Sequence, residues 1–174
     1  MTSIVFPGQG SQVLGMAKDF NDNFKVSNEI FEEIEDYSNI NIRKIIFLND
    51  DNKLDLTKFT QICIFSTSYV IFRTFCIENN FNEKDASVML GHSLGEYTAL
   101  ALAEFISYSD ALKIISVRGV SMQKAVENSN STMAAVLTSD LKQTIDAVKA
   151  LNNQGVAINI SNFNDGTQIV IGGL

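Results

Sequence analysis

The sequence has little of several residue types on which common protein classes depend. Its 174 residues include one histidine, two cysteines, one proline and no tryptophan, and its formal charge is −7. Two cysteines are too few for a disulfide-stapled secreted domain, and one histidine excludes metal sites built from several histidines. The acidic balance, without any basic run, argues against nucleic acid or an anionic membrane as a partner, because phosphate groups need compensating positive charge.

Long hydrophobic runs are also missing. The chain does not open with a basic stretch followed by an apolar one, as a secretory leader does. The most apolar window, residues 62–77, is interrupted by polar residues such as Ser66 and Arg73, so we expect a buried helix there and no membrane span. With 45% hydrophobic residues the chain can bury a core. We therefore expect a soluble protein of the reducing cytoplasm, working as a monomer.

Hydrophobic periodicity divides the chain into a longer α/β part and a shorter α+β part. The longer part is predicted to contain strands at 4–6 and 87–90 and helices at 12–20, 27–37, 56–77, 94–104 and 109–125. After a polar stretch at 127–131, a strand, a helix and two strands are predicted at 133–137, 141–151, 156–160 and 168–171. This order predicts two subdomains, residues 1–126 and 127–174. The last strand has no polar tail after it, which indicates a small subdomain without its final helix and strand.

The most informative motif is Gly91-His92-Ser93-Leu94-Gly95, between a predicted strand and a predicted helix. The pattern G-x-S-x-G at such a turn is typical of a nucleophile elbow, in which a strained turn exposes the serine. The flanking glycines let neighbouring elements approach closely. The start of the helix and the N–H of Leu94 would then face the charge that develops on an attacked carbonyl.

The same residues also fit a purely structural role. Ser93-Leu94-Gly95-Glu96 is a capping box, S-x-x-E, which begins a helix without any catalysis. A cap does not need glycines at both flanking positions, and we therefore favour the nucleophile. His92 directly precedes Ser93, and adjacent side chains at such a turn diverge. We expect a packed turn residue there and not the base that accepts the serine proton.

Arg118 lies in the middle of an apolar stripe when residues 109–125 are projected as a helix. A guanidinium on an apolar face needs a carboxylate partner, because an unpaired buried charge is costly. Two partners fit: an internal Asp or Glu, or the carboxylate of a substrate held bidentately. Spacing alone favours the internal partner. Cys63 and Cys76 fall in the predicted buried helix and are expected to be core residues.

Several short motifs follow one another along the whole chain, each weak singly but specific in this order. They are FPGQGSQ at 6–12, TQ at 60–61, GHSLGEY at 91–97, RG at 118–119, MAA at 133–135, NFN at 162–164 and QIVIG at 168–172. Together they resemble the malonyl-CoA:acyl carrier protein transacylases of fatty acid synthesis. The resemblance implies a hydrolase-like, three-layer α/β large subdomain with an inserted ferredoxin-like small subdomain, both incomplete here.

The resemblance also implies the chemistry. Ser93 is the nucleophile that accepts the acyl group, and the backbone N–H groups of Leu94 and Gln9 form its oxyanion hole. The implied mechanism is ping-pong: Ser93 attacks the malonyl thioester, coenzyme A leaves, and the phosphopantetheine thiol of acyl carrier protein takes the acyl group. The expected partners are malonyl-CoA and acyl carrier protein. The chain itself is expected to hold no cofactor and no metal ion.

For the substrate, the resemblance implies that Arg118 binds the malonyl carboxylate, Gln61 lines the acyl pocket and Asn162 approaches the bound group. One departure is minor: Ile62 stands where the family usually has proline. The other is serious, because the family's general base is a histidine downstream of the small subdomain, and none follows here. Since a positioned base contributes about 10²- to 10⁴-fold, we expect the 174 residues alone to have little or no activity.

Two other functions share part of this pattern. A serine esterase or thioesterase uses the same elbow, but it also needs a histidine and has no use for an arginine in its acyl pocket. A non-catalytic protein that keeps the fold would bind acyl carrier protein without acylation of Ser93. A hydrolysis assay and an acylation assay with malonyl-CoA distinguish these alternatives.

Overall fold

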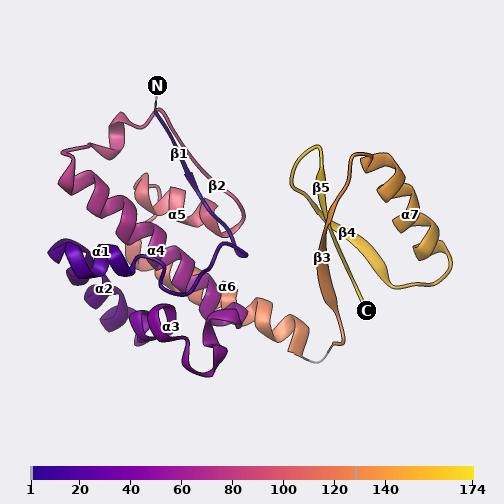
Figure 1. Cartoon of the computed structure of the whole chain (residues 1–174), viewed down its shortest axis with the longest axis horizontal. Helices are drawn as coiled ribbons and strands as arrows, with labels where there is room; N and C mark the ends of the chain where they lie inside the picture. The colour runs from indigo at the N-terminus through magenta and orange to yellow at the C-terminus, as the bar shows by residue number, and fades with distance from the viewer. Residues whose placement is uncertain (1, 128) are drawn as a thin grey trace. The chain divides into compact units, whose positions relative to one another are not determined.

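The computed structural model describes residues 2–127 and 129–174, which form two compact units, Met1–Gln123 and Lys124–Leu174 (Figure 1). The boundary between the units, after Gln123, lies three residues before the boundary predicted at 126/127. The predicted boundary falls at the end of helix α6 (Tyr108–Glu127). Asn128, in the predicted polar stretch, lies outside the described residues. Each unit is described by itself below.

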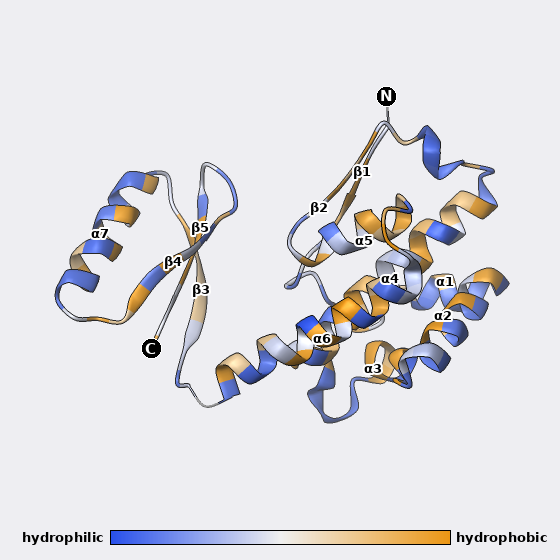
Figure 2. Cartoon of the chain, turned by 180° about the vertical axis from the view of Figure 1, so that it is seen from behind, coloured by the Kyte–Doolittle hydropathy of each residue, from blue (hydrophilic) through white to orange (hydrophobic). Residues whose placement is uncertain are grey.

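The first unit is mixed α/β, as predicted. Its elements are β1 (Ser3–Phe6), α1 (Lys18–Asn23), α2 (Lys25–Ser38), α3 (Ile42–Leu48), α4 (Thr57–Glu78), β2 (Val88–Gly91), α5 (Leu94–Leu102) and α6, with short 3-10 helices at Asp50–Asp55 and Glu83–Asp85. Orange and blue residues alternate along α2 in Figure 2, as in an amphipathic helix that buries one face. The buried face of α2 includes Phe31 and Ile34.

Strands β1 and β2 pair in parallel, in a register that runs from Ser3 opposite Val88 to Phe6 opposite Gly91. One face of this pair packs on α4 and α5 through a buried cluster of Phe6, Phe72, Cys76, Ala99 and Leu102. Side chains on the opposite face are exposed, since Val5 is 68% and Leu90 54% accessible. Because the strands are parallel, the loops that follow them begin at the same edge. That edge is where the predicted nucleophile and Gln9 lie.

Helix α4 lies at the centre of the first unit. Its side chains are buried nearly all round, and its neighbours include α2, α3 and α5. We expected this stretch to be too short and too polar to span a membrane, but by length and composition alone the observed 22-residue helix could do so. Its most apolar window is 67% buried inside the unit, which is what the core helix of a globular domain shows.

Two helices in the first half of the chain differ from the prediction. The helix expected at 12–20 begins only at Lys18, because Gly15 adopts a left-handed φ of 83° and Ala17 one of 57°. The N–H of Gly15 is used outside a helix, donating to the carbonyl of Ile46 at 2.7 Å. Helix α3 was not predicted, although its signals are present: Asn41 caps it by accepting from the N–H of Lys44 at 2.9 Å, and isoleucines follow at helical spacing.

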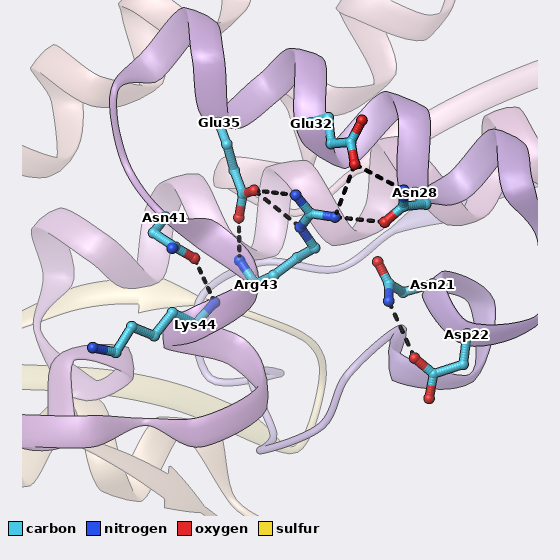
Figure 3. Close-up of polar contacts among 8 residues, drawn as sticks. All are labelled: Asn21, Asp22, Asn28, Glu32, Glu35, Asn41, Arg43 and Lys44. Carbon is cyan, nitrogen blue, oxygen red and sulfur yellow. Dashed lines mark hydrogen bonds and ion pairs between the residues drawn. The ribbon is translucent and has the colours of Figure 1, made fainter.

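An arginine fastens α3 to α2 (Figure 3). The Arg43 guanidinium donates to Glu35 Oε2 from Nε at 2.9 Å and from Nη2 at 2.6 Å, and the Arg43 backbone N–H donates to Glu35 Oε1 at 2.7 Å. Arg43 Nη1 also donates to Asn28 Oδ1 at 2.5 Å. The Glu35 and Arg43 side chains are only 14% and 23% exposed, so water screens this pair little. Both helices pack on α4, so the pair supports the core helix of the unit.

Replacing Glu35 with alanine is therefore expected to lower the free energy of unfolding by about 1–3 kcal/mol, because the backbone N–H, Nε and Nη2 of Arg43 lose their acceptor and only Nη1 keeps Asn28. Urea unfolding followed by circular dichroism measures this change. The matched control is Glu29→Ala, which removes an exposed ion pair with Lys25 on the same helix and should change stability little. Equal effects of the two substitutions would contradict the expected role of Glu35.

The second unit has the predicted order of strand, helix, strand and strand. Strands β3 (Thr132–Leu137), β4 (Ile158–Phe163) and β5 (Gln168–Gly173) form an antiparallel sheet in the order β3-β5-β4. Helix α7 (Leu141–Asn153) contacts β4 and begins at Asp140, whose side chain accepts from the N–H of Gln143 at 3.0 Å. A register shift between Ile160 and Asn162 in β4 marks a β-bulge.

Candidate active site

Ser93 occupies a strained turn between β2 and α5. Its φ is 53° and its ψ −101°, a combination that a residue with a side chain rarely adopts. It precedes the first residue of α5, but its side chain makes no capping hydrogen bond to the helix. The capping-box alternative is therefore not realised here. The strained backbone and the exposed serine are those of a nucleophile elbow.

The glycines of the motif are required by close backbone contacts. A Cβ at Gly91 would lie 1.8 Å from the carbonyl carbon of Gly95, and a Cβ at Gly95 would lie 2.2 Å from the carbonyl oxygen of Phe6. Both distances are far below any real contact, and the atoms that are met belong to the backbone and cannot rotate away. Glycine at 91 therefore lets the turn close on the start of α5, and glycine at 95 lets α5 approach the end of β1.

Arg118 reaches Ser93 from α6. Its Nη2 donates to Ser93 Oγ at 2.8 Å, its Nη1 donates to Oε1 of Gln61, and its Cζ lies 5.6 Å from the ring centroid of Tyr97. The structure thus brings together the predicted nucleophile, in the turn before α5, and two predicted substrate-binding residues, in α4 and α6. The contacts span 25 residues of sequence for Ser93 and 57 for Gln61.

The partners of Arg118 are all neutral. Within residues 2–127 and 129–174, no Asp or Glu side chain forms an ion pair with it. The internal carboxylate that spacing favoured is therefore wrong. The buried face of α6 also differs from the predicted apolar stripe. It is formed by Ala111, Leu112, Ile115 and Gly119, and Arg118 lies beside it, half-buried. The guanidinium therefore has no carboxylate partner among the described residues and lies next to Ser93.

A chain of side-chain amides continues from Arg118. The Gln61 side chain is fully buried, and its Nε2 donates to Gln9 Oε1 at 2.7 Å. The Nε2 of Gln9 in turn donates to Thr57 Oγ1 at 3.3 Å. Because a guanidinium can only donate, the oxygen of Gln61 must face Arg118 and its nitrogen must face Gln9. The arginine thereby sets the orientation of both amides.

Two backbone N–H groups are available beside the serine. In the described part of the chain, neither the N–H of Leu94 nor that of Gln9 has an acceptor. Leu94 is the first residue of α5, so its N–H lies at the positive end of the helix dipole. Gln9 follows β1, and its loop meets the elbow where Gly8 contacts the backbone of His92. Such groups can stabilise an oxyanion that develops on an acyl carbon bound to Ser93.

A close helix crossing supports the site. A Cβ at Gly119 would lie 3.1 Å from both Cα and the carbonyl oxygen of Lys58, so α6 runs against the first turn of α4. Sequence reasoning missed Gly119, Thr57 and Tyr97 as supports. The motifs contain Gly119 and Tyr97, but only the contact between the helices shows what they do.

Other predicted residues lie elsewhere or differ from expectation. Asn162 is an exposed residue of β4 in the second unit, next to the β-bulge, and its Nδ2 donates to Asn164 Oδ1 at 2.5 Å. Its expected approach to the substrate stays a prediction. His92 is exposed, and its ring lies beside Gly8, where an added Cβ would be 3.0 Å from His92 Nδ1. Among the described residues, no group of three or more His, Cys, Asp or Glu side chains is arranged to hold a metal ion.

A large cavity of the first unit lies away from this site. It has a volume of about 610 Å³ and is lined mainly by apolar residues of β1, α1 and α4, without Ser93, Gln61 or Arg118. The cysteines of α4 are core residues, as predicted. Burial raises the pKa of the Cys63 thiol to about 12 and also raises that of Cys76. Both thiols are therefore protonated near neutral pH and are poor nucleophiles.

Comparison with known proteins agrees with this geometry. A model of the acyl transferase domain family matches residues 4–173. The malonyl CoA-acyl carrier protein transacylase of Haemophilus influenzae is 33% identical over 171 residues, which are 98% of this chain and 54% of the relative. That of Bacillus subtilis is 32% identical over 98% of this chain and 42% of the relative. The chain thus spans about half the length of the curated relatives it matches.

Solved structures show the same fold. A malonyl CoA-acyl carrier protein transacylase from Clostridium perfringens superposes with a TM-score of 0.85 at 32% identity, covering 99% of this chain and 53% of that chain. A malonyl-transacylase in complex with a type II PKS acyl-carrier protein gives a TM-score of 0.87 at 34% identity, covering 99% and 54%. The predicted α/β acyltransferase fold, incomplete over these residues, is confirmed.

Proposed function

The chain belongs to the acyl transferase domain family, and on this premise we propose that the protein moves a malonyl group from coenzyme A to the phosphopantetheine thiol of acyl carrier protein in fatty acid synthesis. The names of its relatives support this substrate pair. The observation that carries the proposal is Arg118, whose guanidinium contacts Ser93 Oγ and has only neutral partners. A carboxylate on the acyl group is the natural counterion for such an arginine.

In the proposed reaction, Ser93 Oγ attacks the thioester carbonyl of malonyl-CoA and loses its proton to a general base. The N–H groups of Leu94 and Gln9 stabilise the oxyanion, and the thiol of coenzyme A leaves as the carbonyl re-forms. The thiol of acyl carrier protein then attacks the Ser93 ester, and Ser93 recovers its proton. The base is expected to be a histidine from a part of the protein beyond these 174 residues.

The proposal assigns three residues to substrate binding. Arg118 holds the malonyl carboxylate, Gln61 lines the acyl pocket next to it, and Asn162 approaches the bound group, as the resemblance implies. We further propose that the protein works as a cytoplasmic monomer, with no nucleic-acid or membrane partner and no cofactor or metal ion of its own. The single histidine and the charge of −7 support these last points.

Incubation of the full-length protein with malonyl-CoA tests the function. We expect mass spectrometry to detect one malonyl group on Ser93, and its transfer after acyl carrier protein is added. Hydrolysis with water as the only acceptor would instead indicate an esterase or thioesterase. Binding of acyl carrier protein without acylation of Ser93 would indicate a non-catalytic protein.

Replacing Arg118 with alanine is expected to lower kcat/KM for malonyl-CoA by about 10- to 100-fold, because hydrogen bonds to a charged group contribute about 1.5–3 kcal/mol. Acylation by acetyl-CoA, which carries no carboxylate, should not fall. The ratio of the two rates is the measurement. Equal losses with both substrates would show that Arg118 has a structural role only.

A further inference from the structure

We propose that Tyr97 is a positioning residue for Arg118: its aromatic face holds the guanidinium beside Ser93 and leaves the positive charge available to a carboxylate. This inference rests on the proposed function and adds the support that makes its carboxylate specificity possible. It starts from the contact between the Arg118 Cζ and the Tyr97 ring, whose centroid lies 5.6 Å away. A guanidinium within about 6 Å of an aromatic centroid is attracted by the negative face of the ring.

The position of Tyr97 in the helix explains how one arginine meets both residues. Ser93 immediately precedes α5, and Tyr97 lies one helical turn after it. The two residues are four positions apart, and the Arg118 guanidinium contacts both Ser93 Oγ and the ring of Tyr97. Gln61 of α4 holds the other end of the guanidinium.

The ring of Tyr97 is itself held in place. It is half-buried and packs against the main hydrophobic cluster of the first unit. Arginine has a long side chain with many rotamers, and ordering it on substrate binding would reduce the affinity. A fixed ring therefore lowers this cost before substrate arrives.

The chemical type of the support matters as much as its position. A glutamate or aspartate at this place would hold Arg118 more strongly, but it would also compete with the carboxylate of the substrate. A hydroxyl, an amide and an aromatic face hold the guanidinium without neutralising it. The site is thus organised to receive an anionic acyl group.

The test compares Tyr97→Leu with Tyr97→Phe in the full-length protein. Leucine removes the aromatic face and should lower kcat/KM for malonyl-CoA by about 2- to 30-fold, mainly through KM, with acetyl-CoA unaffected. Phenylalanine keeps the face and should retain the wild-type ratio of the two substrates. Tyr37→Leu is the matched control, because it removes an exposed ring that faces Lys113, a different cation.

Three results would overturn the assignment. Equal losses with both substrates in Tyr97→Leu would indicate a packing role, wild-type rates with both substrates would indicate no role, and a loss in Tyr97→Phe would assign the effect to the hydroxyl. Side-chain NMR of Arg118 tests the positioning role of Tyr97 independently of the proposed function. The Arg118 Nε–H signal, identified by its loss in Arg118→Lys, should be rigid in wild type and Tyr97→Phe and mobile in Tyr97→Leu, even if malonyl-CoA is not the substrate.

Discussion

Replacing Ser93 with alanine is expected to abolish the acyl-enzyme and to lower malonyl transfer by the full-length protein by about 10⁶-fold, the scale found when the nucleophile of a serine protease is removed. The reason is chemical: in the proposed reaction Ser93 Oγ forms the covalent bond to the acyl group. In the structure the same oxygen accepts a hydrogen bond from Arg118 Nη2 at 2.8 Å. The measurement is mass spectrometry after incubation with malonyl-CoA, together with the rate of transfer to acyl carrier protein.

The control for this substitution is Ser139→Ala, at an exposed serine of the second unit. It should load and transfer as wild type does. The substituted Ser93 protein should keep its circular dichroism spectrum, because no helix loses a capping hydrogen bond when the hydroxyl is removed. Malonyl loading that persists without Ser93 would refute the assignment of this serine as the nucleophile.

The second large effect is expected from Gly95→Ala. The added methyl group would lie 2.2 Å from the carbonyl oxygen of Phe6 and 2.8 Å from that of Pro7, so α5 and the end of β1 must separate. Overpacking of this kind costs about 1–3 kcal/mol and occasionally more. Because the same contact places the elbow, we expect lower stability together with loss of malonyl loading.

Urea unfolding and acylation measured on the same preparation check this prediction. Gly166→Ala is the matched control, since a methyl group there meets nothing within 4 Å and its φ is not left-handed. It should leave stability and loading close to wild type. Normal loading by a stable Gly95→Ala protein would mean that the elbow tolerates a side chain at this position.

Local patterns were sufficient for much of the fold. The strands around residues 4–6 and 87–90 and the long buried helix α4 were predicted from apolar runs, and the order of the second unit from its periodicity. The failures also have local causes. A helical pattern at 12–20 is overridden by the left-handed backbone of Gly15, whose N–H bonds instead to Ile46 of α3. That contact involves a helix that was itself not predicted.

The candidate site was only partly predictable for the same reason. The spacing of glycines around Ser93 favoured an elbow, but a capping box also fitted the same letters. The φ of 53° at Ser93 and the missing capping hydrogen bond decide between them. For Arg118 the pattern favoured an internal carboxylate, whereas its partners are Gln61, Ser93 and Tyr97.

The sequence by itself determined which residues are present for the chemistry: a serine between two glycines, an arginine in a helix, and glutamines in two motifs. Only the tertiary structure decided how they combine. The contacts of Arg118 span 25 and 57 residues, and they depend on how α6 crosses α4 and where α5 follows β2. Hydrophobic periodicity indicates only which face of a single helix is buried. The partners of a charged side chain lie on other helices and loops, so they depend on how the whole unit packs.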